Sequence, residues 1–232
     1  MKWSFWHTAG IILLASLTFL NGFLLTPRSA VWAWIVLNLI LMALLLVIGQ
    51  GATGFWKGAL INEDYKVSLS RFQMACWTVI VLSTFLTAVF TNFKSCPGDP
   101  LAIKVPDGLW ILMGISTTSL VASSLILSTK RAKGLISKNA QMKDATMKEM
   151  FQVDEVSHAE RLDLSKIQMF YFTVVTLIAY AVAVIRLFSD PPHCVASLPA
   201  VSDTMAALLG ISHAGYLTSK AVPRAVPGKN GQ

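Results

Sequence analysis

Long apolar segments constrain this chain more than any other feature of its sequence. A helix needs about 20 mostly apolar residues to cross the hydrocarbon core of a bilayer. Segments that meet or approach this requirement are 7–25, 30–48, 72–93, 109–127, 167–188 and 198–219. Only 13% of the residues are charged, whereas a soluble globular domain has about 25%. The sequence therefore predicts an all-α, polytopic transmembrane helical bundle with six spans.

The first and the last segment need arguments of their own. A cleaved signal peptide has a short apolar region before a small-x-small site, whereas segment 7–25 runs almost to Pro27 and the next segment follows at once. We therefore expect residues 1–54 to form a retained N-terminal transmembrane hairpin. Segment 198–219 contains Asp203 and His213 and is followed by Lys220, so its hydropathy alone does not establish a span.

The basic residues indicate how the chain is oriented, because Lys and Arg accumulate in short cytoplasmic loops. With the N-terminus inside, the cytoplasmic set is Lys2, Lys57, Lys66, Arg71, Lys130, Arg131, Lys133, Lys138, Lys143, Lys148, Arg161, Lys166, Lys220, Arg224 and Lys229. Only Arg28, Lys94, Lys104 and Arg186 fall outside it. This distribution predicts a cell inner membrane protein with both termini in the cytoplasm. It also accounts for the net charge of +7, so the lipid bilayer is the expected partner and nucleic acid is not.

A two-helix unit recurs within the sequence. Residues 69–74 read LSRFQM and residues 164–169 read LSKIQM, and nine of the 21 positions from 69 to 89 are identical at an offset of 95. The second helices also align, since LMGIS at 112–116 matches LLGIS at 208–212. We predict tandem parallel repeats at 69–129 and 164–222, a cytoplasmic helical loop at 130–163 and a disordered tail at 223–232. The duplication supports the sixth span, and parallel repeats of this kind occur in transporters.

Two glutamines and one histidine are candidates for an intramembrane function. An unpaired amide is costly in hydrocarbon, so Gln73 and Gln168 are expected to pair with each other or with backbone across the repeat. Coordination of a solute is the alternative. His213 is the only histidine well inside a span, where ionisable groups are candidates for function. A neutral, hydrogen-bonded imidazole and a proton-handling or ligand-binding one are both compatible with the sequence.

Serines inside the spans are a weaker signal. The fourth span is rich in hydroxyl residues, among them Ser116, and the sixth carries Ser212. A hydroxyl can return a hydrogen bond to a carbonyl one turn back in its own helix. Ordinary helix packing is therefore the first interpretation, and the lining of a pore is the second.

Two of the three cysteines are expected to form a disulfide. Cys96 and Cys194 fall in the equivalent outer loops of the two repeats, whereas Cys76 lies within the third span. Disulfides persist in oxidising compartments such as the periplasm. A bond from Cys96 to Cys194 would therefore link the two repeats.

Catalytic motifs are lacking in the sequence, so we expect no enzyme, no metal site and no cofactor. Residues 49–54, GQGATG, match the spacing of a dinucleotide-binding loop, but that loop needs a surrounding βαβ unit, and here a predicted transmembrane helix precedes it. The string Gly210-Ile211-Ser212-His213 resembles the serine motif of rhomboid proteases. Those enzymes take a histidine from another helix, and no other span has one in its interior.

Two classes of function remain. The first is a non-enzymatic scaffold, anchor or accessory subunit of a membrane assembly, which binds a protein partner at the cytoplasmic loop 130–165. Ile136, Ala140, Met147, Met150 and Phe151 suggest a helical stripe there, with methionines that adapt to irregular surfaces. A second copy of the chain is an alternative partner. The other class is an ion channel or small-solute transporter, suggested by the parallel repeats and His213.

Overall fold

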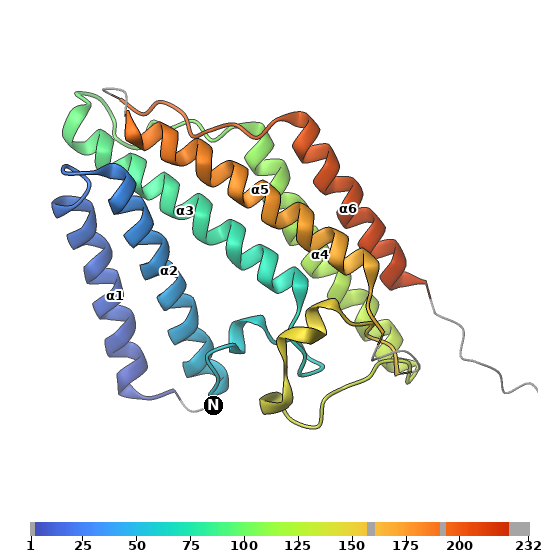
Figure 1. Cartoon of the computed structure of the whole chain (residues 1–232). Coiled ribbons are helices and arrows are strands. Elements are labelled where there is room, and N and C mark those ends of the chain that lie inside the picture. The colour runs from blue at the N-terminus through green and yellow to red at the C-terminus, as the bar shows by residue number, and fades with distance from the viewer. Residues whose placement is uncertain (1–2, 157–160, 191–193, 223–232) are drawn as a thin grey trace, which may run out of the picture.

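The computed structural model describes residues 3–156, 161–190 and 194–222, and over them it is a bundle of six α-helices without extended strands. The helices are α1 (Phe5–Leu24), α2 (Ala30–Thr53), α3 (Leu69–Ser95), α4 (Asp107–Ala132), α5 (Leu164–Ser189) and α6 (Asp203–Ala221). They run between two ends (Figure 1). The disulfide end, at the top, carries the α1–α2 turn and segments 96–106 and 194–202, and the loop end carries segments 54–68 and 133–156.

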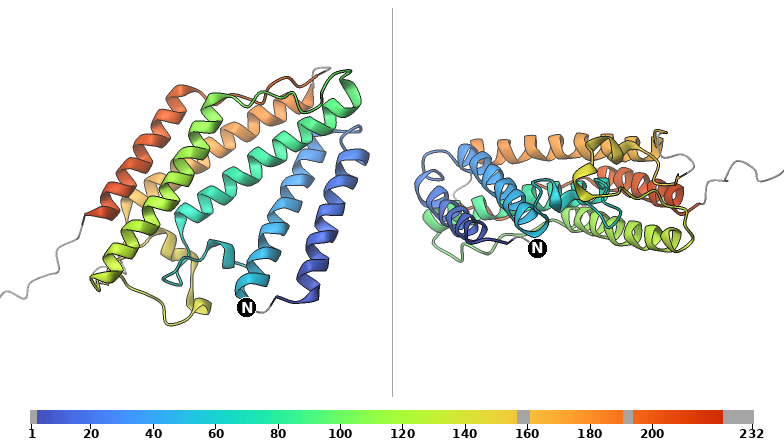
Figure 2. Two further views of the ribbon diagram at one scale, coloured as in Figure 1. Left: turned by 180° about the vertical axis from the view of Figure 1, so that it is seen from behind. Right: turned by 90° about the horizontal axis from the view of Figure 1, so that it is seen from below.

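Five of these helices, α1 to α5, are long and apolar enough to cross a membrane, which supports the prediction of a multi-pass membrane protein. Helix α6 has 19 residues and is not among them. It packs against α4 and α5 and runs between the same two ends (Figure 2). Its complete crossing stays a prediction, and the predicted tail 223–232 lies outside the described residues.

The N-terminal hairpin packs at the edge of the bundle. Helix α1 lies mainly along α2, and Asn21 and Gly22 are its only buried residues among those described. The side-chain amide of Asn21 donates to the backbone oxygen of Ala33 on α2 (3.0 Å). Gly22 lets the ring of Phe90 on α3 approach, because a Cβ at this position would lie 2.4 Å from that ring. Most of the apolar surface of α1 is left for lipid or for another protein.

The core of the bundle contains two tryptophans that join α2, α3 and α5. Trp77 on α3 packs edge-on against Tyr180 on α5, with ring centroids 6.2 Å apart. Trp34 on α2 donates its indole N–H to Thr84 on α3 (3.0 Å). Its position near the start of a span suggests an interfacial residue, yet it is buried. A polar partner on α3 satisfies its only donor, and this allows burial.

The disulfide end is joined by backbone and side-chain contacts as well as by sulfur. Cys96 and Cys194 pair, as predicted, with 5.3 Å between their Cα atoms. Asn92 donates to Val195 O (2.9 Å) and accepts from Val195 N (2.7 Å). Lys104 N donates to Ala196 O, and Leu198 N to Lys104 O. The connections α3–α4 and α5–α6 therefore hold each other in place.

The loop end differs from the prediction of a helical loop at 130–163. After α4 ends at Ala132, the described part of this loop contains the short 3₁₀ helices Met142–Asp144 and Met147–Phe151 and no α-helix before α5. Contacts with segment 54–68 replace helical hydrogen bonds, since Lys57 Nζ donates to Ala145 O and the Asn139 amide donates to Tyr65 O. Tertiary contacts of this kind commonly override a weak helix propensity.

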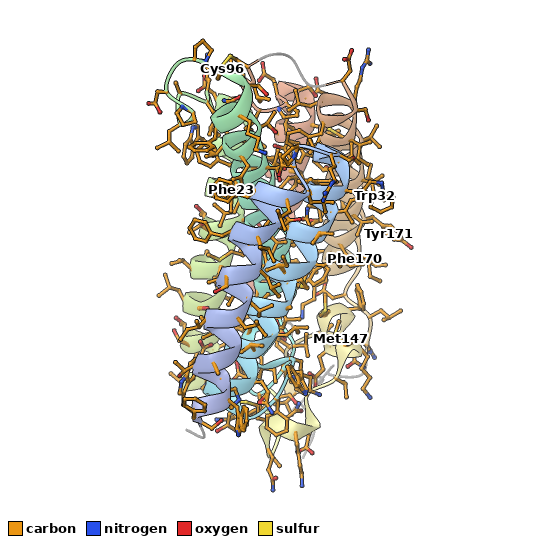
Figure 3. The ribbon with its side chains drawn as sticks, turned by 90° about the vertical axis from the view of Figure 1, so that its left-hand side faces the viewer. Phe23, Trp32, Cys96, Met147, Phe170 and Tyr171 are labelled. Carbon is orange, nitrogen blue, oxygen red and sulfur yellow. A yellow bond between two sulfur atoms is a disulfide. The ribbon has the colours of Figure 1, made fainter. Side chains whose placement is uncertain are left out.

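The predicted role of the loop methionines also needs correction. Met150 is 1% exposed and packs inside the protein with Met169 and Tyr216. It is therefore not available to a partner. Met147 is exposed and stays available (Figure 3).

The burial pattern does not follow the offset of 95 that aligns the predicted repeats. Buried positions of α5 are Lys166, Met169, Thr173, Thr176, Tyr180, Val184 and Phe188, and those lying 96 residues earlier on α3, from Ser70 to Asn92, are all buried. One residue corresponds to about 100° around a helix. The two helices thus bury faces that are rotated relative to the sequence alignment, and the repeat remains a sequence-based prediction.

Candidate functional site

A column of buried polar side chains lies among α3, α4, α5 and α6. Its first layer is centred on Gln73, which is 1% exposed. The Gln73 amide donates to Thr173 Oγ1, and its nitrogen lies 3.4 Å from His213 Nε2. On the other side of the imidazole, His213 Nδ1 lies 2.5 Å from Ser119 Oγ. Residues from all four helices therefore meet in one hydrogen-bonded layer.

The hydrogen bonds of this layer assign the proton on His213. Thr173 donates its own hydroxyl proton to Met169 O (2.8 Å), so it accepts from Gln73. With the amide in this orientation, Gln73 also donates to His213, whose Nε2 is then the acceptor. The proton of the neutral imidazole is on Nδ1 and is donated to Ser119. This arrangement fits a neutral, hydrogen-bonded histidine.

The second layer is centred on the hydroxyl of Tyr216, about one helical turn closer to the loop end. Lys220 Nζ donates to it at 2.8 Å and Ser70 Oγ at 3.3 Å. Ser123 Oγ lies 3.2 Å away, and it receives the hydroxyl proton because the other two partners are donors. Tyr216 thus joins α3, α4 and α6 through one oxygen atom.

Ion pairs close the column at the loop end. Asp154 accepts from Lys166 of α5 (3.0 Å) and from Lys220 of α6 (3.1 Å). Lys130 of α4 pairs with Glu155 at 2.5 Å. All three lysines are buried. Helices α4, α5 and α6 therefore each contribute one lysine that pairs with Asp154 or Glu155 of the loop.

The electrostatics of Asp154 follow from this position. Burial alone would raise the pKa of its carboxyl, but the ammonium groups of Lys220 and Lys166 together hold the pKa well below its ordinary value. The carboxylate is therefore charged at neutral pH. Nearby Lys66 shows the opposite balance, because desolvation lowers the pKa of its ammonium despite the acidic groups around it.

Neither protein-family models nor curated proteins nor solved structures match this chain. The chemistry of the column is therefore the main guide to its role.

The structure brings together only some of the residues singled out from sequence. Gln73 and His213 share the first layer, and Ser116 and Ser212 are buried near it on α4 and α6. The pairing of Gln73 with Gln168 is wrong. Gln168 is exposed, because α5 buries Met169 at that level.

Most residues of the column carry only a weak signal in the sequence. His213, Tyr216 and Lys220 are spaced by three and four residues, and so are Ser116, Ser119, Ser123, Leu127 and Lys130, so that each set marks one face of a helix. This spacing was the available signal. In the sequence, Lys220 marks only the end of a span and the serines favour ordinary packing, while Tyr216 has no signal apart from this spacing.

The layer around His213 is poorly arranged for catalysis by Ser119. A serine nucleophile must give its proton to the base, whereas in the tautomer assigned above the imidazole Nδ1–H donates to the serine oxygen. Ser212, in the rhomboid-like string, has a buried hydroxyl oxygen without a hydrogen-bond partner among the described residues. No described base is therefore hydrogen-bonded to this serine.

Proposed function

We propose that this protein is a non-enzymatic scaffold, anchor or accessory subunit of an assembly in the cell inner membrane. The observation that supports it best is the pairing within the polar column. The amide, imidazole, phenol and ammonium groups bind one another or the acidic residues of the loop end, so that they hold four helices together. Residues that bind a substrate or a permeating ion would need polar atoms directed at that ligand.

The orientation is part of the proposal. Segments at the loop end carry most of the basic residues, which favours a cytoplasmic loop end. The opposite end carries the Cys96–Cys194 pair, which favours an oxidising compartment. Both arguments are consistent with N- and C-termini in the cytoplasm.

The partner surface in this proposal lies at the loop end. Met147, Val156, Leu162 and Leu164 are large apolar residues that remain exposed there. They take the place of Met150 in the partner hypothesis. Site-specific photocrosslinking in intact membranes tests it. A discrete protein adduct is expected from positions 147 and 162, and none from buried position 150 or from exposed Leu101 at the disulfide end. Equal adducts from position 101 would contradict a loop-end partner.

A channel or small-solute carrier is the second candidate. It is favoured by one specific observation, which is that the buried oxygens of Gln73 and Ser212 have no hydrogen-bond partner among the described residues. Purified full chain in liposomes distinguishes the two. The scaffold proposal predicts proton and potassium fluxes equal to those of empty liposomes. A robust flux that is abolished by Gln73→Leu or by a change at His213, but not by Gln168→Leu, would establish the second candidate instead.

A further inference from the structure

The first turn of α2 opens into a cavity of about 450 Å³ at the disulfide end. Its lining comes from the α1–α2 turn, the end of α3 and the end of α5, and includes Thr26, Arg28, Phe90, Lys94 and Phe188. Two cations and several hydroxyls line this cavity, and none of the described lining residues is acidic. The cavity therefore favours an anion.

The two cations have no other evident role. Arg28 and Lys94 belong to the four basic residues that the positive-inside distribution does not explain. Neither forms an ion pair with an acidic residue among the described parts of the chain. Among the described residues, the Arg28 guanidinium makes a single long contact, 3.4 Å, with Leu24 O. Both side chains are exposed and free to meet a ligand.

The N-terminus of α2 adds to this field. Its first-turn N–H groups, at Ala30 and Val31, have no acceptor within the helix, and both residues line the cavity. The positive end of a 24-residue helix thus lies at the cavity. The N-cap Ser29 accepts from Trp32 N, so its own hydroxyl proton remains available to a ligand.

A buried hydroxyl is the independent sign of an absent acceptor. Thr26 lines the cavity, is 8% exposed, and its oxygen has no hydrogen-bond partner among the described residues. Such groups are rare in folded proteins, because desolvation without a hydrogen bond is unfavourable. The oxygen itself is enclosed, so it reaches an oxyanion in the cavity by a rotation of the threonine side chain.

The surroundings indicate which oxyanion this is. The cavity lies at the end of several spans, where headgroups meet hydrocarbon, and exposed Trp32 lies close to this level (Figure 3). Indole side chains favour that boundary. Phe90 and Phe188 form an apolar part of the cavity lining, in addition to the cationic side chains. We propose that this cavity, the α2 anion site, binds the phosphate group of an anionic phospholipid in the leaflet at the disulfide end.

A titration of the melting temperature tests the site on the full chain in non-ionic detergent. Phosphatidylglycerol is expected to raise the melting temperature saturably, and the double variant Arg28→Gln, Lys94→Gln is expected to bind it roughly tenfold or more weakly, because hydrogen bonds to a charged group are lost. The matched control is Lys104→Gln, Arg186→Gln. It removes the same charge at the same end but leaves the cavity unchanged.

The outcomes separate the sources of phosphate. Loss of the saturable shift in the cavity variant alone supports the proposal. A saturable shift with inorganic phosphate but none with phosphatidylglycerol would overturn a lipid as the ligand. Equal losses in both double variants, or no saturable shift with either probe, would overturn the site itself.

Thr26→Val gives a second readout that does not alter charge. Because the threonine hydroxyl has no hydrogen-bond partner in the described part of the chain, valine is expected to leave the lipid-free melting temperature unchanged or to raise it. The same change is expected to weaken phosphatidylglycerol binding several-fold, since a donor to phosphate is lost. Unchanged binding would show that the hydroxyl does not serve the ligand, and would contradict its place in the site.

Discussion

At the scale of single residues, Asp154 is the charge that holds the loop end of α5 and α6. Its carboxylate accepts from both Lys166 and Lys220. Removing one partner of a buried ion pair leaves an uncompensated charge and costs about 3 kcal/mol or more. Asp154→Asn is therefore expected to lower the free energy of unfolding by about that amount, measured by denaturation in detergent. Asp144→Asn is the control, because Asp144 is an exposed acid whose only described acceptor contact is with Gln141 N.

The same carboxylate predicts a dependence on pH. Its pKa in the folded protein lies below the ordinary value, so unfolding takes up a proton once the pH approaches the unfolded pKa of about 4. The stabilisation is then complete above that pH and is lost as the pH falls further. Melting temperatures of the wild type and Asp154→Asn are expected to differ by a constant amount from pH 7 to 5 and to converge below pH 4. Convergence on raising the pH instead would contradict this assignment.

Gln73 and Gln168 form a matched pair within one chain. The sequence aligns them, but only Gln73 is buried, with partners on α5 and α6. Gln73→Leu leaves His213 Nε2 without its donor and is expected to lower the free energy of unfolding by about 1–3 kcal/mol. Gln168→Leu is expected to change it by less than about 0.5 kcal/mol. Equal effects of the two substitutions would restore the symmetric pairing that the structure contradicts.

At the scale of elements, apolar patterning predicted the helices well and the loop poorly. Five predicted spans lie within α1 to α5 except at one end of the first, where α1 ends at Leu24. Each span requires a long apolar segment, and such a segment can be read directly from the sequence. The loop around Met150 depends instead on where Ala145 and Asn139 meet segment 54–68. Contacts between distant segments leave no periodic signal.

The register of the helices shows the same limit. The sequences of α3 and α5 align at an offset of 95 residues, yet their buried positions match at an offset of 96. Apolar side chains are interchangeable in hydrocarbon, so the sequence does not record which of them faces the bundle. The sequence accordingly gives little sign of Tyr216 and Thr173 in the column, whereas His213 and Gln73, predicted as intramembrane polar residues, both lie in it.

The disulfide that links the α3–α4 and α5–α6 connections can be tested separately. Cys96 and Cys194 are 98 residues apart, and closing a long loop restricts the unfolded chain, which is typically worth about 2–4 kcal/mol. The single variants Cys96→Ser and Cys194→Ser and the double variant are expected to have melting temperatures below that of the wild type by the same amount. Each should also abolish the mobility difference between reducing and non-reducing gels. Cys76→Ser is the control and should retain that difference. A wild type without any mobility difference would contradict the bond.

At the scale of the whole molecule, the two ends of the bundle have distinct chemistry. The loop end carries buried ion pairs and most of the positive charge, and the disulfide end carries the cysteine pair and the α2 anion site. Of these features, the distribution of positive charge and the cysteine pair were predicted from the sequence, and the ion pairs and the cavity were not. Composition and charge distribution did not predict that polar side chains of α3 to α6 would bond to one another inside the bundle, because that depends on which faces of these helices meet.

The accessibility of the polar column to water tests this account most directly. In a Cys76→Ala background, Ser119→Cys and Thr173→Cys place a thiol in the column, and Met147→Cys places one on the exposed loop. A small water-soluble thiol reagent, applied to both sides of reconstituted membranes, is expected to label position 147 and to leave 119 and 173 unlabelled on the same time scale. Labelling of 119 and 173 at a rate comparable with 147 would show a water-filled path, and would contradict a closed scaffold in favour of a channel or carrier.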